Sequence, residues 1–358
     1  MATPAIPTAP ALTLTFEEAV LCKLFVDAAQ EIDKDRPQDD PLVLRFAGGW
    51  VRDKLLGLRS ADIDVGINNM TGHGFATRMS EYISANTEKY GIEPGRVSKV
   101  ESNPAKSKHL ETARINILEL EIDFVNLRSE VYSGDGRIPR IEFGTPEEDA
   151  LRRDCTINTL FYNLHTEQVE DFTGLGLQDL ADRLIRTPLP PQATFADDPL
   201  RVLRLIRFAS RLGFTIVPEA KAAMKLPEIK SALKAKISRE RVGTEIGKMF
   251  QGYNPHASLS LIHEVDLYKE VFAPPIQDLP VLPVQDMKIA ADIMRHLLFG
   301  SASSHPRISK LLTTSSERYH AWLIAAMSPW KNQPLPLDHN DNTPTAAVAI
   351  KEALRCSN

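Results

Sequence analysis

Two aspartates one residue apart, Asp62 and Asp64, are the residues of this sequence that most directly indicate chemistry. The apolar residues around them predict a short strand over residues 63–67, and side chains two positions apart on a strand project from the same face. Two carboxylates that close repel each other unless a cation lies between them. Their hard oxygens suit Mg²⁺, which keeps coordination positions open for phosphate oxygens. On a solvated loop the same pair would bind nothing, so neighbouring residues must support the interpretation.

The segment LRFAGGWVRDKLLG supplies that support just upstream. It places Gly48 and Gly49 between a predicted strand over residues 43–47 and a helical stretch over residues 50–58. Glycines let a polyphosphate approach exposed backbone N–H groups, and a helix N-terminus aims further amides at an anion. A glycine pair alone is usually a turn. In this order, with Asp-x-Asp on a second strand, the segment predicts a metal-dependent nucleotidyl-transfer site.

A third carboxylate for such a site can come from the segment LELEIDFVNLR. Residues 118–127 read as a strand that places Glu119, Glu121 and Asp123 on one face. A two-metal site uses a carboxylate from a neighbouring strand, and Asp123 is the candidate, with Glu121 a weaker one. The alternative is a solvated strand face.

The run EEDALRRDCTIN holds two adjacent arginines followed by an aspartate, Arg152, Arg153 and Asp154. Arginines can neutralise phosphates, and an aspartate beside them can accept hydrogen bonds from ribose hydroxyls. Taken alone, this tripeptide is more often a helix surface with an ion pair.

Arginines also recur at steps of three and four residues on a predicted helix that begins near Pro199, with Asp197 or Asp198 as its cap. Residues 197–250 contain 12 basic and 6 acidic residues in a chain of net charge −5. A solvated helix face usually mixes both signs, so this stripe favours contact with phosphates or bases. Its members are Arg201, Arg204, Arg207 and Arg211.

Bulk composition sets wider limits. The chain has 358 residues, of which 43% are hydrophobic and 25% charged, which is ordinary for two or more folded domains. Three cysteines far apart form neither a disulfide framework nor a zinc motif, which fits a reducing compartment. No apolar run reaches membrane-span length, so no membrane partner is expected. Because no Lys or Arg precedes Lys23, no presequence is visible and we expect a cytoplasmic or nuclear protein, with a mitochondrial pool as an alternative.

The expected fold class is α+β, in four segments. Residues 1–14 read as a disordered leader, and residues 15–170 as a mixed α/β domain that opens with a helix over residues 15–32. Helical periodicity then dominates residues 171–270. A Pro-rich connection precedes a last helical segment over residues 271–358.

Five ordered segments resemble the motifs of class II tRNA nucleotidyltransferases, the CCA-adding enzymes, which share a superfamily with bacterial poly(A) polymerases. They are GGWVRDKLLG with DID, RRDCTIN, EDFTGLGLQDL, DDPLRVLRLIRFA and ISRERVGTEIGKMF. The details of EIDFVNLRSEVYSGDGRIPR are most similar to the yeast-like eukaryotic branch. The resemblance implies an N-terminal, polymerase-β-like nucleotidyltransferase head followed by an all-helical neck, which selects the nucleobase, and an all-helical body.

The same resemblance implies roles for matching positions. Asp62 and Asp64 would bind Mg²⁺, with Asp123 as a third catalytic carboxylate. The residues that would bind the nucleotide are Gly48, Gly49, Arg52, Arg152, Arg153, Asp154, Asp198, Arg201 and Arg204. Those that would contact RNA are Arg207, Arg211, Arg239 and Arg241. Asp154 would read the ribose 2′-OH, and Asp198 with Arg201 would read the edge of the base, since that pair matches C and A but not G or U.

The implied activity is addition of CCA to the tRNA 3′ end from CTP and ATP with release of pyrophosphate, by a monomer. Two alternatives stay open. One is a poly(A) polymerase of the same superfamily, and the other is an inactive RNA-binding homologue. Residues 271–358 match none of the motifs, so the tRNA-binding region is expected to be incomplete.

Overall fold

The computed structural model describes residues 12–355 except 38, 94, 101–111, 132–139, 275–278, 300–311 and 334–344. Most of the leader predicted over residues 1–14 therefore lies outside the described residues. The chain divides into two compact units, Met1–Asp182 and Arg183–Asn358, each of which is described by itself.

The first unit is built on a seven-stranded sheet of order β3-β4-β5-β2-β1-β8-β9. The central strands β2 and β5 are parallel, and the other neighbours pair antiparallel. The strands are β1 (Leu44–Ala47), β2 (Asp62–Ile67), β3 (Ser98–Val100), β4 (Thr112–Ile117), β5 (Leu120–Asn126), β8 (Phe161–Asn163) and β9 (Gln168–Glu170). A separate ribbon pairs β6 (Arg128–Val131) with β7 (Arg140–Phe143).

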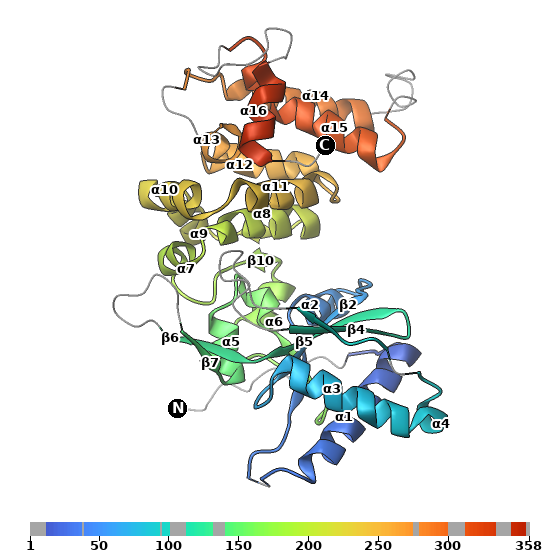
Figure 1. Ribbon diagram of the computed structural model, residues 1–358. Coiled ribbons are helices and arrows are strands. Elements are labelled where there is room, and N and C mark those ends of the chain that lie inside the picture. The colour runs from blue at the N-terminus through green and yellow to red at the C-terminus, as the bar shows by residue number, and fades with distance from the viewer. Residues whose placement is uncertain are drawn as a thin grey trace. The chain divides into compact units, whose positions relative to one another are not determined.

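Helices α1 and α3 lie on one side of this sheet (Figure 1). Phe25 of α1 and Phe75 of α3 both pack against Phe124 of β5, with ring centroids 5.3 and 5.2 Å apart. The helices are α1 (Phe16–Asp33), α2 (Gly49–Leu55), α3 (Gly72–Ala85), α4 (Thr87–Tyr90), α5 (Pro146–Leu151), η2 (Thr156–Asn158) and α6 (Gly176–Ala181). Because strand side chains alternate between faces, covering one face with helices leaves polar side chains to the other.

Two sequence predictions bear directly on the site. The helix predicted over residues 15–32 is confirmed as α1, which begins with a capping box between Thr15 and Glu18. The strand predicted from residue 118 was wrong at its start. Leu118 and Glu119 have φ of 51° and 62° and form the tight turn between β4 and β5. Glu119 therefore leaves the strand face that carries Glu121 and Asp123.

The second unit is helical apart from two short paired strands, β10 (Leu184–Ile185) and β11 (Thr215–Ile216), as predicted for the residues after the head. Its helices are α7 (Pro191–Asp197), α8 (Leu200–Leu212), α9 (Pro218–Met224), α10 (Pro227–Lys236), α11 (Arg239–Phe250), α12 (Pro255–Glu264), α13 (Tyr268–Phe272), α14 (Gln285–Phe299), α15 (Ser315–Ala326), η3 (Ser328–Trp330) and α16 (Thr345–Leu354). The α+β fold class is thus confirmed.

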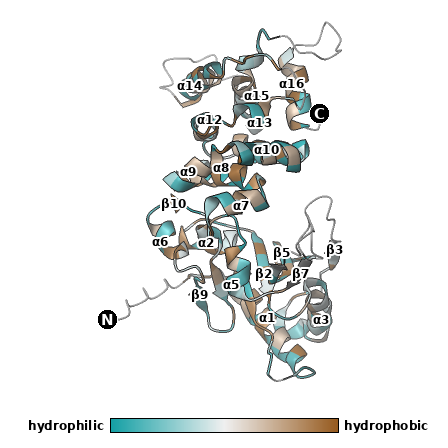
Figure 2. Ribbon diagram, turned by 90° about the vertical axis from the view of Figure 1, so that its left-hand side faces the viewer, coloured by the Kyte–Doolittle hydropathy of each residue, from teal (hydrophilic) through white to brown (hydrophobic). Residues whose placement is uncertain are grey.

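Buried polar contacts hold the later helices of this unit together. The Tyr268 hydroxyl donates to the Ala326 carbonyl at 3.0 Å, and the Trp330 indole N–H donates to the Phe272 carbonyl at 3.1 Å. In Figure 2 these helices show teal and brown segments, as expected when one face of each helix is buried. Among the described residues, no helix is both long and apolar enough to span a bilayer.

Candidate active site

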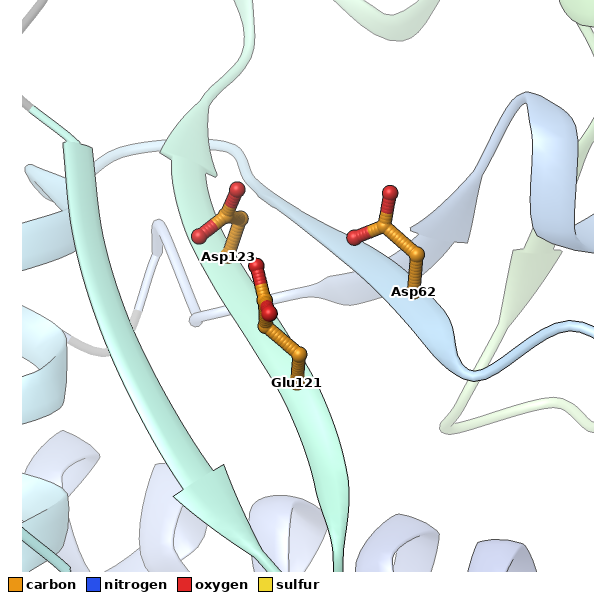
Figure 3. Close-up of side chains that lie close together, drawn as sticks. All are labelled: Asp62, Glu121 and Asp123. Carbon is orange, nitrogen blue, oxygen red and sulfur yellow. The ribbon is translucent and has the colours of Figure 1, made fainter. Parts of the chain in front are cut away.

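The uncovered face of the sheet carries a group of carboxylates from β2 and β5. Oxygens of Asp62, Glu121 and Asp123 lie within 4.8 Å of one another, and Figure 3 shows the three side chains rising from the two adjacent strands. The parallel register places Asp62 beside Glu121 and Asp64 beside Asp123. Ile63, which alternates with the two aspartates, is fully buried on the other face. The donor set is all oxygen, and so it fits a hard divalent cation.

Asp64 is the carboxylate most perturbed by this arrangement. Partial removal from water by the surrounding protein raises its pKa to about 6, although its side chain stays accessible on the sheet face. The positive charge of Arg153 opposes this rise, and the negative charges of Asp62 and Asp123 add to it. Such a carboxylate is stabilised by a proton or by a cation.

Arg114 of β4 is a cationic neighbour that the sequence analysis missed. Its guanidinium donates two hydrogen bonds to Asp123, at 2.7 and 2.6 Å, and also forms an ion pair with Glu121. Arg114 lies opposite Asp123 because a tight hairpin joins β4 to β5. A cation bound on this face would share Asp123 with the guanidinium.

The glycine turn lies in the same unit. Gly48 has φ of 65° and precedes α2, and a Cβ placed there would lie 2.6 Å from Nη1 of Arg153 and 3.3 Å from the Asn158 carbonyl. Only glycine fits both restraints. Arg52 is buried: its Nε donates to Asp53 at 2.8 Å and its Nη1 to Oδ1 of Asn158 at 2.5 Å. Arg52 therefore braces the turn from inside.

The arginines of the second motif are held by Asp149, which the sequence analysis also missed. Asp149 accepts from Nε of Arg152 at 2.9 Å and from Nε and Nη2 of Arg153 at 3.0 and 2.8 Å. Burial alone would raise the pKa of Asp149, but the charges of Arg153 and Arg152 lower it below its usual value. Its spacing of three and four residues from the arginines is the signal that could have found it.

Arg153 and Asp154 complete the cluster. The Arg153 guanidinium lies 4.9 Å from the centre of the Phe161 ring, and its Nη1 donates to the Asn158 carbonyl at 3.0 Å. Asp154 is buried, and its Oδ1 accepts from the backbone N–H of Cys155 and from Nδ2 of Asn158, both at 2.9 Å. The glycine turn and the second motif thus form one connected structure. The positive charge of Arg153 also acts on the carboxylate face, where it opposes the rise in the pKa of Asp64.

In the second unit, Asp198 and two arginines meet at the start of α8. The cap predicted at Asp197 or Asp198 was wrong, because Pro199 occupies the N-cap position of α8 and makes no side-chain cap bond. Asp198 precedes that position, accepts from the backbone N–H of Leu200 at 3.1 Å and forms an ion pair with Arg241 at 3.4 Å. Nη1 of Arg201 donates to the Thr194 carbonyl at 3.2 Å. The predicted base-reading pair therefore lies at one helix end, with Arg241 beside it.

The other basic residues differ in their surroundings. Arg204 lies near the Phe208 ring, at 5.6 Å from its centre. Arg207 pairs with buried Glu245 at 2.6 Å. Arg211 lines a cavity of about 400 Å³ with Arg207 and Lys248.

Arg239 is different because it lies in the interior of the unit. Its guanidinium donates to the carbonyls of Ala353, Glu270 and Val271 at 2.5, 2.7 and 2.5 Å. Burial lowers its pKa to about 10. These bonds make Arg239 a cross-link between helices, so we do not include it among the proposed RNA contacts.

Two segments of the chain match known domain families. Residues 44–186 match the poly A polymerase head domain, and residues 213–279 match a domain described as the probable RNA and SrmB-binding site of polymerase A. The fold and the carboxylate face therefore define the first unit as a nucleotidyltransferase head.

Individual relatives narrow the family. The mitochondrial CCA tRNA nucleotidyltransferase of Saccharomyces cerevisiae is 54% identical over 265 residues, which cover 74% of this chain and 48% of that protein. The tRNA nucleotidyltransferase cca1 of Schizosaccharomyces pombe is 39% identical over 355 residues, covering 97% and 68%. A solved Thermotoga maritima CCA-adding enzyme shares the fold, with a TM-score of 0.63 at 21% identity, covering 94% of this chain and 66% of that one. The chain belongs to the tRNA nucleotidyltransferase family, and it spans about half the length of the S. cerevisiae relative.

Proposed function

We propose that this chain carries the catalytic part of an enzyme that adds CCA to the 3′ end of tRNA from CTP and ATP and releases pyrophosphate. The observation that carries the proposal is the assembly, in one unit, of the carboxylate face, the glycine turn and the Asp149-held arginines. The names of the S. cerevisiae and S. pombe relatives support tRNA as the acceptor.

The residues of the head would divide the work of nucleotidyl transfer. Asp62 and Asp64 would hold Mg²⁺, with Asp123 as the third carboxylate and Glu121 close to Asp62 and Asp123. The ion would supply charge neutralisation at the triphosphate and activation of the attacking 3′-OH. The backbone N–H groups of the glycine turn and the guanidinium of Arg153 would bind the triphosphate, with Arg152 beside them, and buried Arg52 would brace the turn. This is the positioning and charge stabilisation that most of phosphoryl transfer requires.

Asp154 would accept a hydrogen bond from the ribose 2′-OH. Its carboxylate is buried and fixed by two donors, which suits an acceptor that must meet one hydroxyl in one place. The assignment rests on the resemblance of RRDCTIN to the second family motif.

Base selection would belong to Asp198 and Arg201, with Arg204 next on the helix. An aspartate accepts from the exocyclic amine of C or A, and an arginine donates to a ring nitrogen or carbonyl oxygen. The hydrogen bond that Asp198 accepts from the backbone N–H of Leu200 supports this role, because it fixes the carboxylate to the start of α8.

tRNA binding would use basic residues of the helical unit that are partly or fully exposed. Arg207, Arg211 and Arg241 are the proposed contacts, and their positive charge would neutralise RNA phosphates. Two further facts support an RNA partner: the printed description of the domain matched at residues 213–279 and the tRNA bound in the T. maritima structure.

The experiment is primer extension by the purified chain. It would be incubated with Mg²⁺, a tRNA that lacks its 3′ CCA, and CTP and ATP supplied separately and together, and the 3′ ends would be sequenced. We expect two C and then one A, with A added only after C. Long A tails without C would favour a poly(A) polymerase, and RNA binding without any addition would favour an RNA-binding homologue.

Compartment and oligomeric state are separate proposals. We expect a monomer in the cytoplasm or nucleus, and the mitochondrial name of the S. cerevisiae relative supports an additional mitochondrial pool. Fractionation with an antibody to the chain and light scattering of the purified protein test these two points. A purely mitochondrial signal or a defined dimer would contradict them.

A further inference from the structure

One buried asparagine, Asn158 of η2, connects the glycine turn with its Arg52 to the second motif with its Arg153 and Asp154. Its Oδ1 accepts from Nη1 of Arg52 at 2.5 Å, and its Nδ2 donates to Oδ1 of Asp154 at 2.9 Å. Its backbone carbonyl accepts from Nη1 of Arg153 at 3.0 Å. Only 7% of Asn158 is exposed, so these bonds are shielded from competing water.

The chemistry of the two partners fixes which way the amide points. A guanidinium has no acceptor and an ionised carboxylate has no donor, so the amide oxygen must face Arg52 and the amide nitrogen must face Asp154. No other side chain of the same size offers one donor and one acceptor in this geometry. Leucine would satisfy neither partner, and aspartate would satisfy only Arg52.

The bond to Asp154 restricts a side chain that would otherwise rotate. The terminal torsion of an aspartate has a broad, two-fold distribution. Here Oδ1 of Asp154 is held from two directions, by the backbone N–H of Cys155 and by the amide of Asn158. A carboxylate held in this way keeps one orientation.

We propose that Asn158 is a positioning residue that sets the selection of ribonucleotides over deoxyribonucleotides. It holds the Asp154 carboxylate where a ribose 2′-OH meets it, and it ties that carboxylate to the arginine that braces the triphosphate turn. The inference rests on the proposed function, because Asp154 is there assigned to the 2′-OH. A site that is built to bond a substrate hydroxyl rejects the analogue without it, since its buried polar group is then left unpaired.

The substitution Asn158→Asp removes the hydrogen bond to Asp154 but keeps an acceptor for Arg52. The new side chain is nearly the same shape and still offers an oxygen to Arg52, but it loses the donor to Asp154 and sets a second carboxylate against it. The matched control is Asn163→Asp on β8. Asn163 is also buried, at 5% exposure, and its Nδ2 donates to Oε1 of Glu170 at 2.8 Å, so the control loses the same kind of bond elsewhere in the unit.

The experiment measures equilibrium binding of CTP, dCTP and inorganic triphosphate by calorimetry. It uses the full chain with Mg²⁺ and without RNA, so that no turnover occurs, and thermal unfolding checks that each variant is folded. We expect Asn158→Asp to lower the ratio of CTP to dCTP affinity by about tenfold, which corresponds to the loss of one good hydrogen bond. Affinity for triphosphate, which has no ribose, should change by less than about threefold, and Asn163→Asp should preserve the CTP to dCTP ratio.

Other results would overturn the inference. Equal losses of CTP and dCTP affinity in Asn158→Asp would mean that Asn158 only maintains the fold. Equal binding of CTP and dCTP by the wild type would show that the site does not select ribonucleotides. If Asn158→Asp does not fold, Asn158→Ala removes both links without adding charge, and an unchanged ratio in that variant contradicts the inference. A chain that prefers CTP to dCTP but never extends tRNA would contradict the proposed function alone. Normal CCA addition with full sugar selection in Asn158→Asp would contradict this inference alone.

Discussion

Replacing Gly48 by alanine should destabilise the glycine turn in two ways, and alanine substitutions at two other glycines can distinguish them. The first is backbone strain, because Gly48 has φ of 65° and ψ of −116°, and holding a residue with a side chain there costs about 1–3 kcal/mol. The second is displacement of Arg153, whose Nη1 would lie 2.6 Å from the new methyl carbon. Moving that nitrogen breaks its bond to the Asn158 carbonyl, at about 1 kcal/mol.

Two other glycines serve as controls. Gly57 has φ of 70° but meets nothing within 4 Å, so Gly57→Ala should show the positive-φ cost alone, about 1 kcal/mol. At Gly49 an added Cβ would meet only Nη2 of Arg52, at an ordinary 3.6 Å, and Gly49→Ala should lie within about 0.5 kcal/mol of wild type. The free energy of unfolding of Gly48→Ala should then fall by about 2–4 kcal/mol.

The assay is denaturant unfolding of the three variants, with triphosphate binding measured on the folded proteins. We expect the stability loss to increase in the order Gly49→Ala, Gly57→Ala, Gly48→Ala. We also expect Gly48→Ala to bind triphosphate more weakly than Gly57→Ala, which lies outside the glycine turn. A Gly48→Ala variant no less stable than Gly57→Ala, with normal triphosphate binding, would refute the reasoning. It would show that Arg153 does not pack against the glycine turn.

Four further predictions test other parts of the structure. Asp149→Asn should lower the free energy of unfolding by about 3–5 kcal/mol, because two neighbouring guanidinium groups lose a buried counter-charge; a loss below about 1 kcal/mol in denaturant unfolding would contradict the ion-pair assignment. The pKa of Asp64 is raised from 3.8 to about 6, so its contribution to the stability of the metal-free protein is present below about pH 4 and lost as pH rises through 6. Mg²⁺ should therefore raise the melting temperature more at pH 7.5 than at pH 5, and equal shifts at both values would be inconsistent with a cation at Asp64. Changing Leu118 to Asn together with Glu119 to Gly should stabilise the chain by about 1 kcal/mol in thermal unfolding, because both positions have positive φ; destabilisation would count against the turn. Arg239→Met should cost about 2–4 kcal/mol of unfolding free energy by stranding buried carbonyls, yet leave RNA affinity within about twofold in filter binding; a large loss of RNA affinity in the folded variant would restore Arg239 as an RNA contact.

Local features of the site could be predicted from the sequence. Alternation along a strand is enough to place Asp62 and Asp64 on one face, and the structure shows that face turned away from α1 and α3. Helix capping at Thr15 and the apolar side of α8 likewise depend on residues within a few positions of each other. These features follow from backbone periodicity, which sequence spacing reports directly.

What could not be predicted depends on contacts between distant residues. Arg52 and Asn158 are 106 positions apart, and the pairing of β1 with β8 helps to bring their segments together. Arg239 stands in a basic stretch that looks solvent-facing, but the carbonyls of Glu270, Val271 and Ala353 surround its guanidinium in the folded unit. Tertiary packing overrides local pattern in both cases.

The prediction of a strand at Leu118 and Glu119 was wrong for a different reason. Neither Leu118 nor Glu119 is a residue that favours positive φ, so the sequence carries no turn signal there. The pairing of β4 with β5 imposes that conformation, and with it the loss of Glu119 from the carboxylate face.

The most direct test of the central claim is whether nucleotide addition depends on the carboxylate face. Single-turnover extension of a tRNA lacking CCA would compare wild type, the double variant Asp62→Ala/Asp64→Ala, and a control that removes two exposed carboxylates of the same unit, Glu81→Ala/Glu88→Ala. We predict CCA addition by the wild type and the control, and a loss of at least about a thousandfold in the Asp62/Asp64 variant, which should still fold and bind RNA. Equal addition by all three proteins, or none by a wild type that binds both tRNA and CTP, would contradict the account.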